Sequence, residues 1–64
     1  MNRKEIYDKI QVMAFNRKKR HITQEAVSKM TGVSRSNISN FERGIVNNMY
    51  LYEFYLNNFG GSGK

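Results

Sequence analysis

The sequence predicts an all-α fold of four helices, and three observations support this prediction. Apolar residues recur at helical spacing near the N-terminus, at Ile6, Ile10, Met13 and Ala14. Capping residues and glycines divide the rest of the chain into short segments, and the sequence contains no proline. No segment shows the strict alternation of apolar and polar residues that is typical of a β-strand. The 64 residues are enough for one domain with a small core.

The first helix is expected over Arg3–Arg20. Asn2 is a candidate N-cap, because an asparagine side chain can accept a hydrogen bond from an unpaired N–H of the first turn. Glu5 and Asp8 lie near the start, and the basic cluster 17–20 lies at the other end. Both arrangements suit the helix dipole.

Two short helices are expected next. Thr23 is a candidate cap for a helix of about two turns that ends at Gly32. Ser34 is a candidate cap for a third helix, which runs to Glu42 and is ended by Gly44.

The fourth helix is expected to begin near Asn48, with Asn47 or Asn48 as its cap, and to continue to about Phe59. The domain would then span residues 1–59. Residues 60–64 (GGSGK) are predicted to be a flexible tail. Their composition suits an artificial linker and a native tail equally well.

The charge of the chain indicates a polyanionic partner. Eleven Lys and Arg against five acidic residues give a net charge of +6. Such an excess attracts nucleic acid or an anionic membrane surface. No apolar run approaches the roughly 20 residues of a membrane span, and no signal-peptide pattern opens the chain. The basic first helix has a narrow apolar face and no Trp, which makes membrane-surface binding the weaker alternative.

The composition argues against several other classes of protein. The chain has no cysteine and a single histidine, His21, so neither a disulfide framework nor a metal site is expected. No group of carboxylates converges visibly, and no glycine-rich loop could hold a phosphate. We therefore expect a protein that is not an enzyme, requires no cofactor and is located in the cytoplasm.

The stretch from Gln24 to Arg43 carries the functional signal. Two short helices joined by a tight turn must cross closely. The small side chain of Ser28 would permit that approach, and Gly32 would permit a left-handed backbone in the turn. The apolar residues expected to support the crossing from behind are Val27, Val33, Ile38 and Phe41.

The outer face of the third helix is polar. Its hydrogen-bonding and cationic residues are Arg35, Ser36, Ser39, Asn40 and Arg43. An α-helix fits the DNA major groove, where Arg pairs bidentately with guanine and Asn with adenine. A helix that only faced solvent would more typically carry Glu and Lys pairs. The pattern therefore predicts a helix that reads double-stranded DNA.

These residues resemble the helix-turn-helix of the phage repressor and Cro proteins, the Xre family. The matching segments are ITQE at 22–25, TGVSR at 31–35 and ISNFERG at 38–44. The resemblance covers about residues 6–59 and is strongest in the middle. It implies a compact lambda-repressor-like domain of four helices, or a five-helix domain of which this chain holds four. The helix-turn-helix would occupy about residues 23–43.

The resemblance also implies roles for individual residues. The residues that match base-reading positions are Arg35, Ser36 and Asn40, with Ser39 as a weaker candidate. The residues that match phosphate-contacting positions are Gln24, Ser34, Asn37 and Arg43. Arg17 would pair with Glu42 and tie the first helix to the end of the third. From the basic cluster, Lys18 and Lys19 are further candidates for phosphate contact.

The fourth helix is apolar on nearly every side, so we expect more than one face of it to be covered. In the segment before this helix the sequence also departs from the family pattern, because Ile45 and Val46 follow Glu-Arg-Gly without a proline. A homodimer or protein-partner surface is predicted from the residues Ile45, Val46, Tyr52, Tyr55, Leu56 and Phe59.

Together these observations predict a sequence-specific transcriptional regulator, a repressor or Cro-like switch from a phage, mobile element or bacterial host. The helix over residues 34–42 would enter the major groove of a palindromic operator. The alternative is an antitoxin-type autoregulator whose apolar last helix holds a partner protein.

Overall fold

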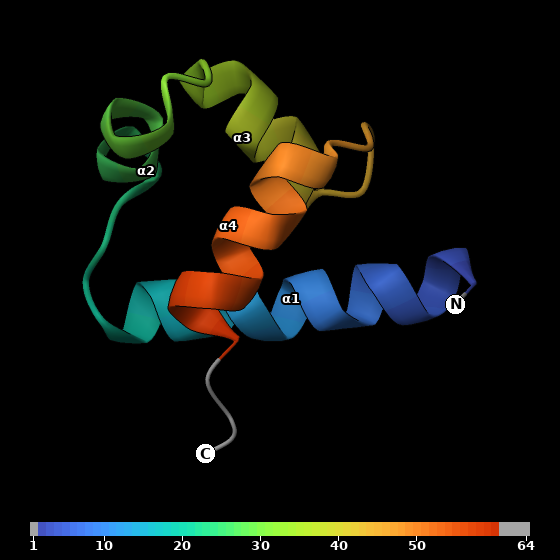
Figure 1. Ribbon diagram of the computed structural model, residues 1–64. Coiled ribbons are helices and arrows are strands. Elements are labelled where there is room, and N and C mark those ends of the chain that lie inside the picture. The colour runs from blue at the N-terminus through green and yellow to red at the C-terminus, as the bar shows by residue number, and fades with distance from the viewer. Residues whose placement is uncertain (1, 61–64) are drawn as a thin grey trace.

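The computed structural model describes residues 2–60, and within that range it contains four α-helices and no strand. They are α1 (Arg3–Lys19), α2 (Gln24–Thr31), α3 (Arg35–Glu42) and α4 (Met49–Phe59). In Figure 1, α4 crosses α1 at the bottom of the view, and α2 and α3 pack together above α1. The predicted all-α fold is confirmed. Apart from Gly60, the expected tail lies outside the described residues.

Each helix begins at a cap that the sequence predicts. The side chains of Asn2, Thr23, Ser34 and Asn48 each accept a hydrogen bond from the backbone N–H three residues later. A cap of this kind stabilises a helix by about 1 kcal/mol. The four starting points are therefore encoded locally, by residues that directly precede each helix.

The core forms where the helices meet. α1 packs against α3 and α4, and α2 packs against α3. The buried hydrophobic cluster consists of Ile10, Met13, Val27, Ile38, Phe41, Leu51, Tyr55 and Phe59. The ring of Tyr55 lies edge-to-face against both Phe41 and Phe59, with centroids 5.1 Å and 5.2 Å apart. Such aromatic pairs add to the stability that burial itself provides.

The burial of α4 corrects part of the predicted partner surface. Tyr55 and Phe59 are 0% and 1% exposed, so both belong to the core and their assignment to a surface was wrong. They lie four residues apart in line with Leu51, which places all three on the stripe of α4 that faces inward. Tyr52 is half-buried, whereas Leu56 is 44% exposed.

Two glycines occupy left-handed backbone conformations that end helices. Gly32 follows α2 with φ of +76°, and Gly44 follows α3 with φ of +78°. Their surroundings differ. A Cβ on Gly32 would meet no atom within 4 Å, whereas a Cβ on Gly44 would lie 2.8 Å from the ring of Tyr7. The turn after α3 is therefore held against α1 by close packing.

We expect Gly44→Ala to destabilise the domain more than Gly32→Ala. Both substitutions impose left-handed strain of about 1–2 kcal/mol on a residue with a side chain. Gly44→Ala must also displace the Tyr7 ring, which adds an overpacking cost of about 1–3 kcal/mol. Urea denaturation followed by circular dichroism measures both losses, with Gly32→Ala as the matched control. Equal losses would contradict the close packing of Tyr7 on the turn.

Candidate nucleic-acid interface

The α2–α3 pair forms the frame of the candidate interface. The turn between the two helices comprises Gly32, Val33 and Ser34. Val27 and Ile38 are completely buried on the inner sides of the two helices, and Val33 packs against the core cluster. Because the apolar side of α3 is held by this packing, its opposite side is fixed in orientation and faces outward.

Of the predicted base-reading residues, Ser36 and Asn40 lie on that outer side, and Arg35 and Ser39 lie on its flanks. Arg35 and Ser36 are exposed in the first turn of α3, and Ser39 and Asn40 are half-buried one turn later. No ion pair or hydrogen bond of the Arg35 side chain is found among the described residues. Its guanidinium is therefore available to an external acceptor.

Two predicted phosphate-contacting residues stand next to this face. Ser34 and Asn37 are both exposed, and the Ser34 hydroxyl oxygen accepts a hydrogen bond from the backbone N–H of Asn37 at 3.2 Å. The capping bond uses the oxygen of Ser34 as an acceptor. Its hydroxyl proton is thus still able to donate to a phosphate.

A polar hollow of about 460 Å³ lies beside α3, where α1, the start of α2 and the end of α3 converge. It is lined by Tyr7, Gln11, Ala14, Lys18, Gln24, Ser39, Glu42 and Arg43. Four of the predicted DNA-contacting residues, Lys18, Gln24, Ser39 and Arg43, are thus brought together from three helices. The hollow would present cationic and amide donors to an anion.

Lys19 does not line this hollow. Its ammonium group lies 5.8 Å from the centre of the Phe15 ring. Consecutive helical residues point about 100° apart. The structure therefore separates Lys18 from Lys19, although the sequence grouped them together.

Tyr7 and Gln11 line the hollow, and the sequence interpretation missed both. A signal was present, because Tyr7, Gln11, Ala14 and Lys18 follow one another at intervals of four, three and four residues. This spacing defines a single stripe along a helix. Gln11 also donates a hydrogen bond from its amide to the backbone carbonyl of Glu42.

A buried ion pair lies beneath the hollow. Nε and Nη2 of Arg17 donate to the two carboxylate oxygens of Glu42, at 2.8 Å and 3.0 Å. The two residues are only 4% and 7% exposed. Arg17 donates further to the carbonyl of Ile22 at 2.6 Å. The ion pair that the resemblance implied is present, in the bidentate geometry that fixes both partners.

Two more side chains complete the network around Glu42. The amide of Gln24 donates to one carboxylate oxygen at 3.1 Å, and the hydroxyl of Tyr55 donates to the other. Gln24, predicted to contact phosphate, therefore has an internal partner. Its amide nitrogen carries a second N–H that can still point outward. The network joins all four helices at the carboxylate.

The network shifts the pKa of both acidic members. Burial alone would raise the pKa of Glu42, but the hydrogen bonds from Arg17, Tyr55 and Gln24 and the charge of Arg17 outweigh it and hold the pKa below its ordinary value. Burial, and then the neighbouring carboxylate, strongly raise the pKa of Tyr55. Glu42 is thus ionised and Tyr55 is a hydrogen-bond donor at neutral pH.

Alkaline conditions should therefore weaken the fold through Tyr55. Its pKa is raised on folding, so its contribution to stability is complete below the ordinary tyrosine pKa of 10.0 and declines as the pH rises above it. We expect Tyr55→Phe to cost about 1.5–3 kcal/mol at neutral pH, because Glu42 loses a donor. The variant should also lose stability less steeply in alkali, as measured by urea denaturation at increasing pH. Parallel pH profiles would contradict this role of the hydroxyl.

Comparison with known proteins supports this arrangement. The family model described as helix-turn-helix matches residues 15–47, from the second half of α1 to the loop before α4. The matched segment contains both members of the ion pair and all of α2 and α3. Neither the curated proteins nor the solved structures give a significant match. No helix among residues 2–60 has the length and apolarity that a membrane crossing requires.

Proposed function

Because this chain belongs to the helix-turn-helix family of Xre-like DNA-binding regulators, which is not a family of enzymes, we propose that it is a repressor or Cro-like switch that reads a specific duplex sequence. The observation that carries the proposal is the outer face of α3. Arg35 and Ser36 are exposed in its first turn, and the half-buried Asn40 follows one turn later, on a helix whose other side packs into the core. These side chains suit the hydrogen-bonding groups of base edges.

The polar hollow supports a docking geometry. With α3 in the major groove, the start of α2 would approach the sugar-phosphate backbone. Lys18, Gln24 and Arg43 would then supply contacts that position the domain without reading sequence. Ser34 and Asn37 would add hydrogen bonds to phosphate at the start of α3. We propose that this takes place in the cytoplasm of a bacterial cell, on the DNA of a host, phage or mobile element.

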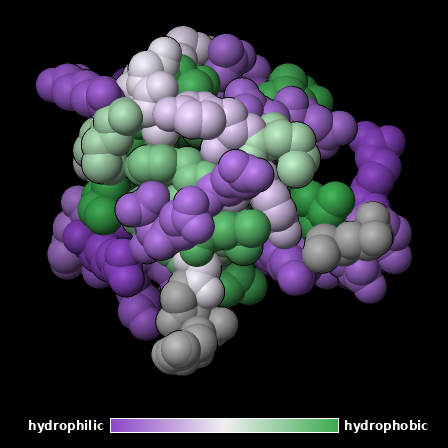
Figure 2. Space-filling view, in the orientation of Figure 1, coloured by the Kyte–Doolittle hydropathy of each residue, from purple (hydrophilic) through white to green (hydrophobic). Residues whose placement is uncertain are grey.

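We further propose that the protein acts as a homodimer. Ile45 and Leu56 are 59% and 44% exposed, and Val46 and Tyr52 extend the same predicted surface. Hydrophobic side chains reach the surface on the face where α4 crosses α1 (Figure 2). Apolar surface of this kind marks interaction sites. A two-fold dimer would bind a palindromic operator whose half-sites lie about one helical turn apart.

An antitoxin-type autoregulator is the second candidate. It is favoured by Met49 and Tyr50, which are 70% and 56% exposed at the start of α4 and enlarge the apolar area. Size-exclusion chromatography with light scattering separates the two proposals. A dimer at micromolar concentration supports self-association. A monomer that still binds DNA would contradict it and favour a different protein on this surface.

Selection of bound sequences from a pool of random duplexes tests the main proposal. We expect enrichment of a palindromic sequence, with half-sites separated by one helical turn. The selection reports base preference, site symmetry and spacing together. A protein that shows no preference among duplexes at physiological ionic strength would contradict sequence-specific regulation.

Lys18→Ala should weaken the binding of selected and random duplexes to the same extent. The lost side chain would contact phosphate, and each phosphate contact contributes affinity that is independent of sequence. We expect the slope of log affinity against log salt concentration to fall by about one unit. Lys9→Ala removes the same charge from an exposed position of α1 outside the hollow, and serves as the control. A loss limited to the selected duplex would assign Lys18 to base reading.

A further inference from the structure

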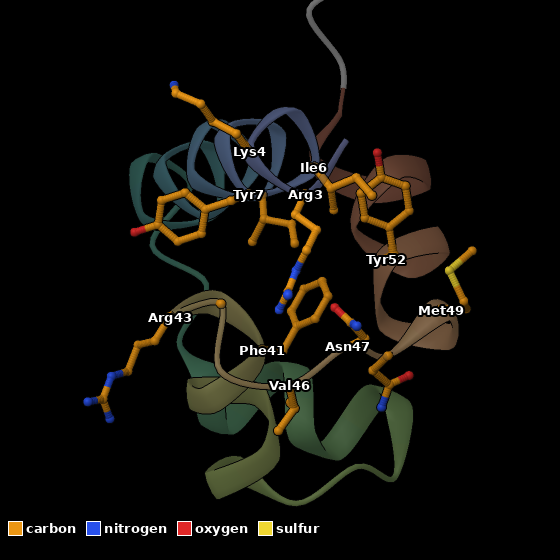
Figure 3. A pocket seen from close by; sticks show the side chains of 13 residues that line it. Arg3, Lys4, Ile6, Tyr7, Phe41, Arg43, Val46, Asn47, Met49 and Tyr52 are labelled. Carbon is orange, nitrogen blue, oxygen red and sulfur yellow. The ribbon is translucent and has the colours of Figure 1, made fainter. Parts of the chain in front are cut away.

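A second cavity, of about 800 Å³, opens between the first half of α1, the loop after α3 and the start of α4. Its walls are largely apolar. They are formed by Ile6, Tyr7, Phe41, Val46, Met49 and Tyr52 (Figure 3). The volume falls within the range of about 300–1,000 Å³ that is typical of small-molecule sites. Among the residues proposed to contact DNA, Arg43 lines this cavity, but its side chain points away from it (Figure 3).

The charged residues that line the cavity are all cations: Arg3, Lys4 and Arg43. In Figure 3 the side chain of Arg3 points inward, toward the middle of the lining side chains, whereas Lys4 and Arg43 point away. Lys4 pairs with Asp8 at 3.2 Å. No ion pair or hydrogen bond of the Arg3 side chain is found among residues 2–60. A cation thus faces an apolar cavity without an acidic partner.

We propose that this cavity binds a small amphipathic carboxylate with a medium-length alkyl chain. The carboxylate would accept paired hydrogen bonds from the Arg3 guanidinium, a geometry that the planar fork of arginine favours. The alkyl chain would lie against Phe41, Met49 and Tyr52. Methionine and aromatic side chains adapt to such a chain without demanding one shape. The proposal concerns ligand binding alone, so it does not depend on the DNA-binding function.

Charge disfavours a second copy of the chain as the occupant. A two-fold contact centred on the cavity would bring the same three cations of each copy together, on a protein of net charge +6. The dimer surface proposed above shares Val46 and Tyr52 with the cavity wall, whereas its more exposed members Ile45 and Leu56 lie outside the cavity. A ligand with an anionic group and an apolar tail would match both the apolar walls of the cavity and the cations that line it.

Titration with decanoate, followed by two-dimensional NMR of the ¹⁵N-labelled chain, tests the proposal. We expect saturable shifts below the micelle concentration, confined to the residues around the cavity. Decanol has the same chain length without the charge, and should bind about tenfold more weakly, the worth of one charge-assisted hydrogen bond. Shifts that do not saturate, or that lie away from the cavity, would overturn the assignment.

Two variants separate the carboxylate from the alkyl chain. Arg3→Gln should lower decanoate affinity about tenfold and leave decanol affinity unchanged. Met49→Ser alters a residue that is 70% exposed, so the fold should tolerate it, and it should weaken both ligands. Lys9→Gln, which removes a cation outside the cavity, is the matched control. Equal decanoate affinity for Arg3→Gln and Lys9→Gln would overturn the role of Arg3.

Light scattering during the titration tests the other candidate occupant of the cavity, a second copy of the chain. We expect decanoate to bind with the same affinity whether or not the protein is associated. If the ligand bound only to the monomer and dissociated the dimer, the cavity would belong to the self-contact. That result would overturn the proposal of a small-molecule site.

Discussion

Arg17→Ala is expected to lower the free energy of unfolding by about 3–5 kcal/mol, because it leaves a buried carboxylate without its cation. Glu42 is 7% exposed, and Arg17 supplies two of its hydrogen bonds. The carbonyl of Ile22 would lose its donor as well. A domain of this size rarely has more than about 3–5 kcal/mol of stability in total. We therefore expect the variant to be largely unfolded.

An exposed ion pair in the same helix provides the control. Lys4 and Asp8 are paired at 3.2 Å, but their side chains are 83% and 58% exposed. Lys4→Ala should cost no more than about 0.5 kcal/mol. Urea denaturation followed by circular dichroism compares the two variants directly. An Arg17→Ala protein within about 1 kcal/mol of the wild type would mean that the ion pair behaves like a surface pair.

Glu42→Gln provides a second variant in case Arg17→Ala does not fold. The glutamine side chain has nearly the same shape and keeps an oxygen that can accept from Tyr55 or Gln24. It leaves the Arg17 charge buried without its counterion. We expect a loss that is still well above that of Lys4→Ala. Equal stability of Glu42→Gln and Lys4→Ala would contradict a buried charge pair.

Elements of the fold that depend on neighbouring residues could be predicted from the sequence. Each cap lies directly before its helix, and Gly32 and Gly44 lie directly after theirs. Local chemistry decides these positions, because the hydrogen bonds involved span only three or four residues. No knowledge of the packing between helices was required.

The inward face of α4 could not be predicted in this way. A helix that is apolar on nearly every side gives no periodic signal to distinguish the buried stripe from the exposed one. The crossing with α1 decides it, and it buries Tyr55 and Phe59 while leaving Leu56 exposed. The same crossing brings the Tyr55 hydroxyl to Glu42, thirteen residues away in sequence. The spacing of residues carries no information about such contacts.

Only part of the candidate site could be predicted from the sequence, because the rest depends on how the helices pack. The outer face of α3 follows from helical periodicity once its inner stripe is known. The polar hollow depends on where α1 lies against α3, so Lys18 is included and Lys19 is not. The Arg17–Glu42 pair spans 25 residues and was accessible through the family resemblance alone. The carboxylate that stabilises the fold therefore also fixes α3 relative to α1.

Arg35→Ala is expected to weaken binding of the selected duplex by about 1–3 kcal/mol and to relax the preference at one base pair. This corresponds to roughly a tenfold to hundredfold loss of affinity. Arg35 is exposed in the first turn of α3, where its guanidinium would reach a guanine edge in the major groove. Binding of random duplexes should weaken much less, because only one of many cationic side chains is lost.

Fluorescence anisotropy with the selected duplex and with a random duplex measures both losses for each variant. Lys18→Ala is the control for loss of charge, since it should affect the two duplexes alike. Arg35→Lys keeps the charge but removes the planar fork that pairs with two acceptors at once. If Arg35 reads a base, Arg35→Lys should bind random duplexes as the wild type does and still lose the preference. Equal losses on both duplexes would instead assign Arg35 to the phosphate backbone, and the reading of sequence would then fall to Ser36 and Asn40.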